Sequence, residues 1–138
     1  MTALVEAVAL GQRYTLPRPH PLAHTRSVEA LHDVSFALEA GRTLGVVGES
    51  GSGKSTLARL VMALERPSAG QLLFDGRDLH ALSPAGLRAA RRDFQMVFQD
   101  PYSSLDPKRT IAESIGEPFA VHGKMRRSER DANVERLL

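Results

Sequence analysis

The sequence contains no cysteine and no tryptophan, and these absences exclude several kinds of site. Without cysteine, the chain has no disulfide bonds, no thiolate metal ligands and no cysteine nucleophile. The only tyrosines are Tyr14 and Tyr102, the net charge is only +2 and the basic residues are scattered, so no nucleic-acid partner is expected. No apolar run approaches the roughly 18–20 residues that a membrane-spanning helix needs.

What is present is the composition of one globular domain, or part of one. The 138 residues are 42% hydrophobic and 25% charged, and both shares are ordinary. The apolar start, Met1–Leu10, includes Glu6 and has no basic lead, so it is not a secretory signal. We therefore expect a cytoplasmic chain that reaches a membrane only by docking on a membrane protein. The chain stops at Leu137 and Leu138 inside an apolar helical stripe with no glycine cap, which is typical of a truncated chain.

The first third of the sequence predicts strands joined by turns. Leu4–Leu10 reads as a strand, and the three prolines within residues 16–27 predict a loop or hairpin tip, because proline cannot donate to a ladder. Apolar and polar residues alternate over Val34–Glu39, which is the period of a strand with one buried face. Thr43–Val47 is a short run rich in β-branched residues, as expected of a fully buried strand.

Local signals predict the remaining elements. Leu57, Leu60, Val61 and Leu64 have the spacing of one helical face, and Pro67 is expected to end that helix. Strands are expected at Gln71–Phe74 and Phe94–Phe98, with a turn at Asp75–Gly76. Helices are expected to begin at Ser83–Pro84 and at Thr110. A capping box is expected at Ser128–Asp131, followed by an apolar helical face of Val134, Leu137 and Leu138.

A glycine-rich loop, Gly48–Ser55, lies between the expected buried strand and the helix after it. Its sequence GESGSGKS matches the phosphate-loop (Walker A) pattern G-x-x-x-x-G-K-[ST] at every fixed position. Glycine lets the backbone approach phosphate oxygens, and successive N–H groups together with the helix N-terminus form an anion nest. Lys54 supplies a mobile charge to the β- and γ-phosphates, and the Ser55 hydroxyl is placed to ligate Mg²⁺. The predicted ATP site is therefore Gly48, Glu49, Ser50, Gly51, Ser52, Gly53, Lys54 and Ser55.

Other phosphate-loop classes fit the sequence less well. A GTPase needs an Asn-Lys-x-Asp motif, but the only asparagine, Asn133, is followed by Val134. A small-molecule kinase uses arginines in a lid. Arg91 and Arg92 could serve, although paired arginines usually lie at a solvated helix end. The kinase interpretation stays open as the weaker alternative.

Three segments resemble the ATP-binding subunits of ABC transporters. Gly45–Leu57 is similar to the family's form of the phosphate loop, and Val34–Phe36 followed by Gly41 resembles its approach. Phe98–Pro107, with the sequence FQDPYSSLDP, resembles the Q-loop of the peptide and nickel importer subfamily. The resemblance covers nearly the whole chain and is weakest over Arg13–Arg26.

The resemblance implies roles for further residues. Gln99 resembles the Q-loop glutamine, which reaches the Mg²⁺ and the attacking water. A neutral amide suits that role because it can both accept and donate. Gln99 is thus implied to be catalytic together with Lys54, and a metal ligand together with Ser55. Tyr14 resembles the aromatic residue that stacks on adenine, and Thr56 is implied to lie near the α-phosphate. Glu49 occupies a variable position and is expected to point away from the phosphates.

Three parts of a complete ABC ATPase are missing from the sequence: the Leu-Ser-Gly-Gly-Gln signature, the Walker B strand ending in Asp-Glu, and the switch histidine. Leu82–Gly86 begins like a signature, but Pro84 and Ala85 stand where glycines are required. Leu72–Asp75 looks like a Walker B run, but Gly76 follows instead of an acid. In the family these parts lie downstream of the point where this sequence stops. We therefore expect weak nucleotide binding and scarcely any hydrolysis from the 138 residues alone.

The resemblance implies an α/β fold. Residues 1–98 would form a P-loop NTPase core sheet of the ABC type with an N-terminal antiparallel β subdomain. Residues 99–138 would form the Q-loop and the start of a helical subdomain. Together they form an incomplete domain. The implied function is the ATP-binding, energy-coupling subunit of a bacterial importer of peptides, nickel or glutathione-like solutes. The implied cofactors are ATP and Mg²⁺.

The implied partners are permease subunits in the membrane, a second ATP-binding subunit and, indirectly, a solute-binding protein. The implied location is the inner face of the plasma membrane. A non-catalytic nucleotide-binding fragment stays open as an alternative, because the sequence holds the binding residues without the downstream catalytic ones.

Overall fold

The computed structural model describes residues 3–20, 24–100, 104–123 and 125–138. These fall into two compact units, Met1–Arg91 and Arg92–Leu138. Pro101, Tyr102 and Ser103, which carry part of the Q-loop resemblance, lie outside the described residues.

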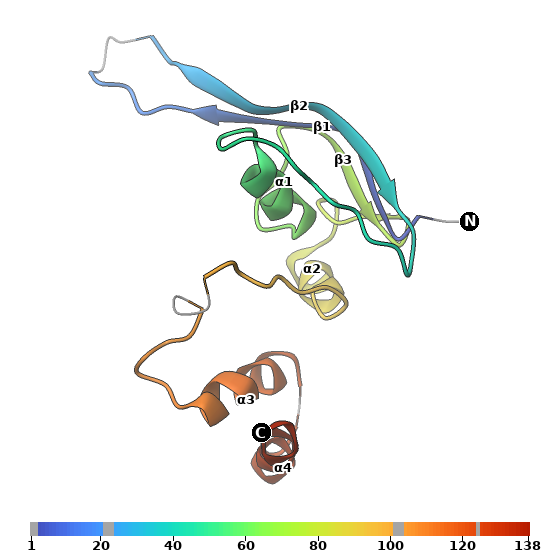
Figure 1. The fold of residues 1–138 in the computed structure, drawn as a ribbon, viewed down its shortest axis with the longest axis vertical. Coiled ribbons are helices and arrows are strands. Elements are labelled where there is room, and N and C mark those ends of the chain that lie inside the picture. Colours follow the sequence, from blue (N-terminus) through green and yellow to red (C-terminus); the bar gives the residue numbers. More distant parts are fainter. Residues whose placement is uncertain (1–2, 21–23, 101–103, 124) are drawn as a thin grey trace. The chain divides into compact units, whose positions relative to one another are not determined.

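The first unit is built on an antiparallel sheet with the strand order β2-β1-β3-β4 (Figure 1). Its strands are β1 (Val5–Thr15), β2 (Ser27–Leu38), β3 (Ala69–Phe74) and β4 (Arg77–Asp78). The expected strands at Leu4–Leu10, Val34–Glu39 and Gln71–Phe74 are therefore confirmed. β1 and β2 extend further than the apolar pattern indicated, because their pairing continues outward to Thr15 opposite Ser27.

The centre of β1 departs from regular strand geometry. Ala9 has a positive φ of 49°, and its N–H donates to the Oγ of Ser35 at 2.8 Å instead of to a ladder carbonyl. Gly70 of β3 passes so close that an added Cβ would lie 2.3 Å from the Ala9 carbonyl oxygen. Only glycine at this position allows the two strands to pair across the irregularity.

Helix α1 (Lys54–Val61) lies against one face of this sheet (Figure 1). Leu57 and Leu60 are buried, as the helical spacing predicted. The helix ends before the expected breaker Pro67, because Ala63 adopts a left-handed conformation with φ of 48°. A left-handed residue just after a helix turns the chain away from the helix axis.

The turn and helix start predicted further along are confirmed. Asp75 and Gly76 both have positive φ and join β3 to β4 in a tight hairpin. Helix α2 (Pro84–Ala90) begins at the N-cap Ser83, whose hydroxyl accepts a hydrogen bond from the Gly86 N–H at 3.2 Å.

Two strand predictions are wrong. Neither Thr43–Val47 nor Phe94–Phe98 forms a strand, and one valine in each, Val47 and Val97, is 93% and 95% exposed respectively. A buried strand needs neighbours on both edges and cover on both faces, and no described strand pairs with either segment. The α/β fold class and the N-terminal antiparallel sheet are as expected, whereas these core strands are not formed within the described residues.

The second unit contains helices α3 (Ile111–His122) and α4 (Arg127–Leu137), which lie side by side (Figure 1). α3 begins as expected at Thr110, which forms a capping box with Glu113: the Thr110 N–H donates to the Glu113 carboxylate at 2.8 Å, and the Glu113 N–H donates to the Thr110 hydroxyl at 3.2 Å.

The predicted capping box at Ser128–Asp131 is wrong. The N-cap of α4 is Arg126, whose N–H donates to the Glu129 carboxylate at 3.2 Å, so the helix starts before Ser128. Of the expected apolar face only Val134 is buried; Leu137 and Leu138 are exposed. Among the helices in the described ranges, none has the combination of length and apolar character needed to cross a bilayer.

Candidate functional site

The glycine-rich loop leads directly into helix α1. Gly51 and Gly53 have φ of 82° and 94°, values that place both in the left-handed region where a side chain is disfavoured. Gly53 is the N-cap of α1, and its carbonyl accepts the first helical hydrogen bond from the Leu57 N–H at 2.8 Å. No side chain caps this helix start, and its first turn carries no acidic residue. The N–H groups of the first turn therefore have no carboxylate competing with an incoming anion.

The ammonium group of Lys54 lies over the loop. Its Nζ donates to the carbonyl oxygens of Gly48 at 2.7 Å and Glu49 at 2.5 Å, and to the Ser52 hydroxyl at 3.3 Å. The Ser52 N–H also donates to the Glu49 carbonyl at 3.2 Å, which tightens the turn. The ammonium group is thus held by two backbone carbonyls and one hydroxyl of the loop that is predicted to bind phosphate.

Two of the loop glycines lie in close contact with neighbouring groups. A Cβ added to Gly48 would lie 2.7 Å from the Ser52 hydroxyl oxygen, which Lys54 also contacts. A Cβ added to Gly53 would lie 2.5 Å from the Ala30 carbonyl oxygen and 2.8 Å from the Leu31 side chain, both on β2. The loop therefore packs directly on the β1–β2 hairpin, which fixes the start of α1.

The remaining predicted residues of the loop lie at or near its surface. Ser55, the expected Mg²⁺ ligand, is exposed in the first turn of α1, and Thr56 follows it half-buried. Glu49 and Ser50 are exposed. Within the described residues, no group of three histidine, cysteine or acidic side chains could hold a metal ion by itself. The donor set fits a magnesium ion bound through the Ser55 hydroxyl and the phosphates of a nucleotide.

Tyr14, the expected adenine-stacking residue, lies on β1 opposite Val28. Its phenolic O–H donates a hydrogen bond to the carboxylate of Glu65, which lies between α1 and β3. Glu65 was not singled out in the sequence, and no motif could have found it, because the contact joins residues separated by 51 positions.

Gln99, the expected Q-loop glutamine, belongs to the second unit and is exposed in an irregular segment. The phosphate loop belongs to the first unit. After Gln99, the Ser104 hydroxyl donates to the Asp100 carbonyl at 2.6 Å, and the Lys108 N–H donates to the Asp106 carboxylate at 2.9 Å. Both bonds are local, since each joins residues at most four positions apart.

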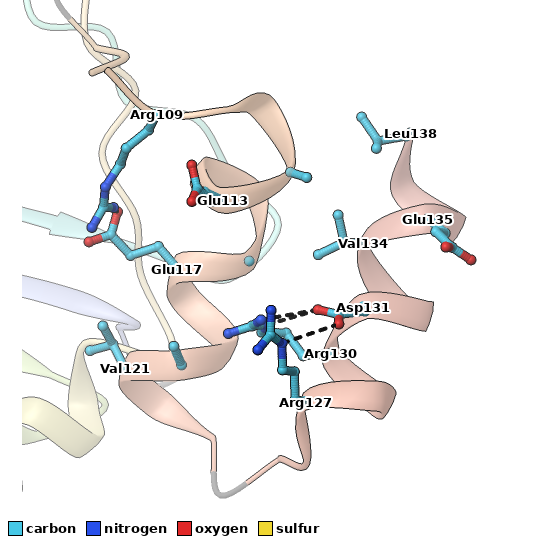
Figure 2. Close-up of a pocket in the computed structure, with 13 residues that line it drawn as sticks. Arg109, Glu113, Glu117, Val121, Arg127, Arg130, Asp131, Val134, Glu135 and Leu138 are labelled. Carbon is cyan, nitrogen blue, oxygen red and sulfur yellow. Dashed lines mark hydrogen bonds and ion pairs between the residues drawn. The ribbon is translucent and has the colours of Figure 1, made fainter. Parts of the chain in front are cut away.

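A pocket of about 630 Å³ lies between α3 and α4 in the second unit (Figure 2). Ion pairs join residues of its lining: Arg109 with Glu117 at 2.8 Å, and Arg130 with Asp131 at 3.1 Å. None of the predicted nucleotide-binding residues lines it. Its lining includes acidic side chains as well as arginines, so it offers no clear excess of positive charge to an anion.

The sequence is similar to a known protein family and to curated members of it. The sequence model of the ABC transporter family matches residues 31–138. The glutathione import ATP-binding protein GsiA of Escherichia coli O6:H1 (strain CFT073) is 51% identical over 114 residues, which are 83% of this chain. The protein of the same name from E. coli strain K12 is 50% identical over the same length. The chain spans only 18% of the length of these relatives.

Solved structures share the fold. The ATP-binding cassette MJ0796, in a dimeric post-hydrolysis state bound to ADP and Pi, superposes with a TM-score of 0.74 over 96% of this chain and 54% of its own. The protein cbiO1 from Clostridium perfringens, part of the transporter complex cbiONQ, gives 0.71 over 99% of this chain and 49% of its own. The identities are 24% and 23%, so these two structures bear on the fold alone.

Proposed function

Because the chain belongs to the ABC transporter family, we propose that it forms the ATP-binding part of an importer's energy-coupling subunit. The observation that carries this proposal is the placement of Lys54, whose Nζ is held over the phosphate loop by the Gly48 and Glu49 carbonyls. A cation beside free N–H groups at an uncapped helix start is suited to the β- and γ-phosphates of a nucleotide.

Each residue of the site has its own role in binding the nucleotide. Gly51 and Gly53 shape the backbone so that N–H groups converge on the phosphates, and Lys54 moves from carbonyl oxygens to phosphate oxygens as the nucleotide enters. Ser55 and Gln99 would hold Mg²⁺, which supplies charge neutralisation at the β- and γ-phosphates. Thr56 lies near the α-phosphate, and the ring of Tyr14 stacks on the adenine base.

Hydrolysis needs groups beyond these. Gln99, a neutral amide, can orient a water molecule by accepting a hydrogen bond from it, and this adds no charge to the site. The 138 residues contain no Leu-Ser-Gly-Gly-Gln signature and no hydrophobic run ending in Asp-Glu. Since phosphoryl transfer depends mostly on positioning and electrostatics, these residues by themselves bind nucleotide with little turnover.

The relatives suggest what is transported. The curated relatives carry the name of a glutathione import ATP-binding protein, and glutathione is a short peptide. We therefore assign this chain to import of peptides or glutathione-like solutes. Its partners are permease subunits, a second ATP-binding subunit and, through the permease, a solute-binding protein. It works on the inner face of the plasma membrane.

Two variants test the proposal. In cells that lack the gene, uptake of radiolabelled glutathione or dipeptide should fall. The wild-type gene and a Lys108→Ala control should restore it, whereas Lys54→Ala should not. Lys108 is an exposed lysine in the second unit and has no proposed role. Restoration of uptake by Lys54→Ala would exclude the phosphate loop as the energy-coupling site. ATP binding without any effect on uptake would favour a nucleotide-binding protein outside transport.

A further inference from the structure

The two oxygens of the Glu65 carboxylate contact two different elements. One accepts the phenolic O–H of Tyr14 on β1, and the other lies 3.4 Å from the guanidinium of Arg59 in the last turn of α1. The Glu65 side chain is 29% exposed, against 55% for Arg59, so the carboxylate is the more enclosed partner. Glu65 therefore bridges the strand that carries the aromatic ring and the helix that begins at Lys54.

The backbone around Glu65 is held close to α1. The left-handed turn at Ala63 is fixed by its N–H, which donates to the Leu60 carbonyl at 2.9 Å. The next N–H, of Leu64, donates to the carbonyl of Arg59 at 2.9 Å. Arg59 thus holds this segment twice, through its carbonyl oxygen and through its guanidinium, and Glu65 has little freedom to leave Tyr14.

A second contact fixes the same face of β1. Two residues before Tyr14, the side chain of Gln12 is buried, and its oxygen accepts a hydrogen bond from the Ser68 N–H at 2.9 Å. Gln12 and Tyr14 therefore both face the segment that connects α1 to β3. The ring of Tyr14 is held against this segment at its outer end by Glu65 and through its strand by Gln12.

We propose that Glu65 is a positioning residue for the nucleotide base: it holds the ring of Tyr14 in place for stacking and links that ring, through Arg59, to the helix whose first residue binds the phosphates. This inference rests on the proposed function. A tyrosine side chain swings about its Cα–Cβ bond, and a hydrogen bond that anchors the phenolic oxygen limits that swing before the ligand arrives. Fixing the ring in advance removes an ordering cost from binding.

The expected size of the effect is modest and specific. A single hydrogen bond of ordinary net strength changes an affinity by about threefold to tenfold. Because Glu65 acts on the ring that meets the base, its loss should weaken binding of ATP. Binding of inorganic tripolyphosphate, which has no base, should not change.

Because the sequence has no tryptophan, the fluorescence of Tyr14 can be used to follow binding. In a Tyr102→Phe background, Tyr14 is the only tyrosine and no tryptophan is present, so it dominates the emission, and stacking of adenine on its ring should quench that emission. We expect Glu65→Ala to weaken ATP binding about threefold to tenfold and to reduce the quenching at saturation. Glu65→Gln, which keeps an acceptor for the phenol, should restore both. Glu39→Ala, at an exposed glutamate in the same unit, is the control and should change neither.

Titration calorimetry with ATP and with tripolyphosphate completes the test. Tyr14→Phe, which keeps the ring and loses the hydroxyl, should match Glu65→Ala, and the two changes together should cost no more than either alone. Tyr14→Ala should weaken ATP binding at least as much. Thermal unfolding of each variant checks that the fold is kept.

Different failures have different meanings. If Tyr14→Ala binds ATP like the wild type, Tyr14 is not the stacking residue and the inference is overturned, while Lys54→Ala still tests the phosphate site. If Tyr14→Ala weakens binding but Glu65→Ala and Tyr14→Phe do not, Glu65 does not position the ring, and the proposed function stands. If Glu65→Ala weakens tripolyphosphate equally, Glu65 supports the fold in general and the positioning role is lost. Unchanged ATP binding by Lys54→Ala would remove the proposed function itself.

Discussion

The Nζ atom of Lys54 lies 2.7 Å from the carbonyl oxygen of Gly48, so one hydrogen bond joins the start of α1 to the first glycine of the phosphate loop. The loop is closed on itself before any ligand binds. A nucleotide must exchange these carbonyl partners for phosphate oxygens, which carry a full negative charge and bind the ammonium more strongly. The affinity of the site therefore depends on how freely the loop's own contacts can rearrange.

Gly48→Ala should weaken ATP binding, because the added Cβ would lie 2.7 Å from the Ser52 hydroxyl oxygen and displace a group that Lys54 contacts. Gly45→Ala is a matched control, since a Cβ there would meet nothing within 4 Å. Calorimetric titration of both variants checks the difference. Adding Ser52→Ala to Gly48→Ala removes the displaced oxygen and should recover part of the affinity. A loss of equal size in Gly45→Ala would show that the contact is not the cause.

Gly70→Ala should destabilise the first unit severely, by roughly 4 kcal/mol or more, because the new Cβ would lie 2.3 Å from the backbone of β1 at a positive φ of 80°. Gly76→Ala has a similar φ of 71° but open space around it, and should cost only about 1–2 kcal/mol. Urea unfolding of the two variants measures the difference. Equal losses would mean that the left-handed backbone, and not the close approach, accounts for the glycine at position 70.

Acid should loosen the start of α3. Hydrogen bonds from the backbone N–H and the hydroxyl of Thr110 lower the pKa of Glu113 below its ordinary value. A carboxylate whose pKa is lower in the folded state stabilises that state fully above the unfolded pKa, near 4.5, and loses this contribution as pH falls through the folded pKa. Helical circular dichroism should therefore decline below about pH 4.5 in the wild type.

Glu113→Gln removes this titration, so its helix signal should depend less on pH in the same range. Glu135, an exposed glutamate of α4 with no capping role, provides the control through Glu135→Gln, which should keep the wild-type profile. Identical acid profiles for wild type and Glu113→Gln would contradict the assignment.

Val47→Lys and Val97→Lys should leave the free energy of unfolding within about 0.5 kcal/mol of the wild type, because both side chains are almost fully exposed. They should also reduce self-association, since each interrupts an exposed apolar segment of strand-like composition. Denaturant unfolding and analytical ultracentrifugation measure the two effects. A loss of several kcal/mol would show that these segments are buried in solution.

The elements that the sequence predicted correctly are those specified by neighbouring residues. Ser83–Pro84 starts α2 because a hydroxyl caps N–H groups only three residues away, and Asp75–Gly76 turns because both accept positive φ. The phosphate loop is local in the same sense. Its glycines, Lys54 and the following helix form one continuous stretch, so a pattern of eight residues is enough to predict it, and its role in binding phosphate stays a prediction.

What the sequence did not predict depends on distant partners. An apolar β-branched run becomes a strand only where another strand pairs with it, so Thr43–Val47 and Phe94–Phe98 were overpredicted. The contact between Tyr14 and Glu65 likewise joins positions 51 residues apart through the fold, and of the two only Tyr14 has a role predicted from the sequence. The end of α1 at Val61, just before the left-handed Ala63, was not predicted because alanine carries no preference for the left-handed region.

The contact of Gly53 with the Ala30 carbonyl has a practical consequence for mutational mapping of the loop. A side chain at Gly53 would push on the hairpin as well as on the helix start, so a loss of binding there would confound recognition with misfolding. Gly51, where an added Cβ meets nothing, carries only the backbone penalty of its positive φ. Gly53 therefore supports two elements at once, the β1–β2 hairpin and the start of α1. A substitution scan should draw its conclusions about ligand preference from loop positions whose side chains would meet only solvent.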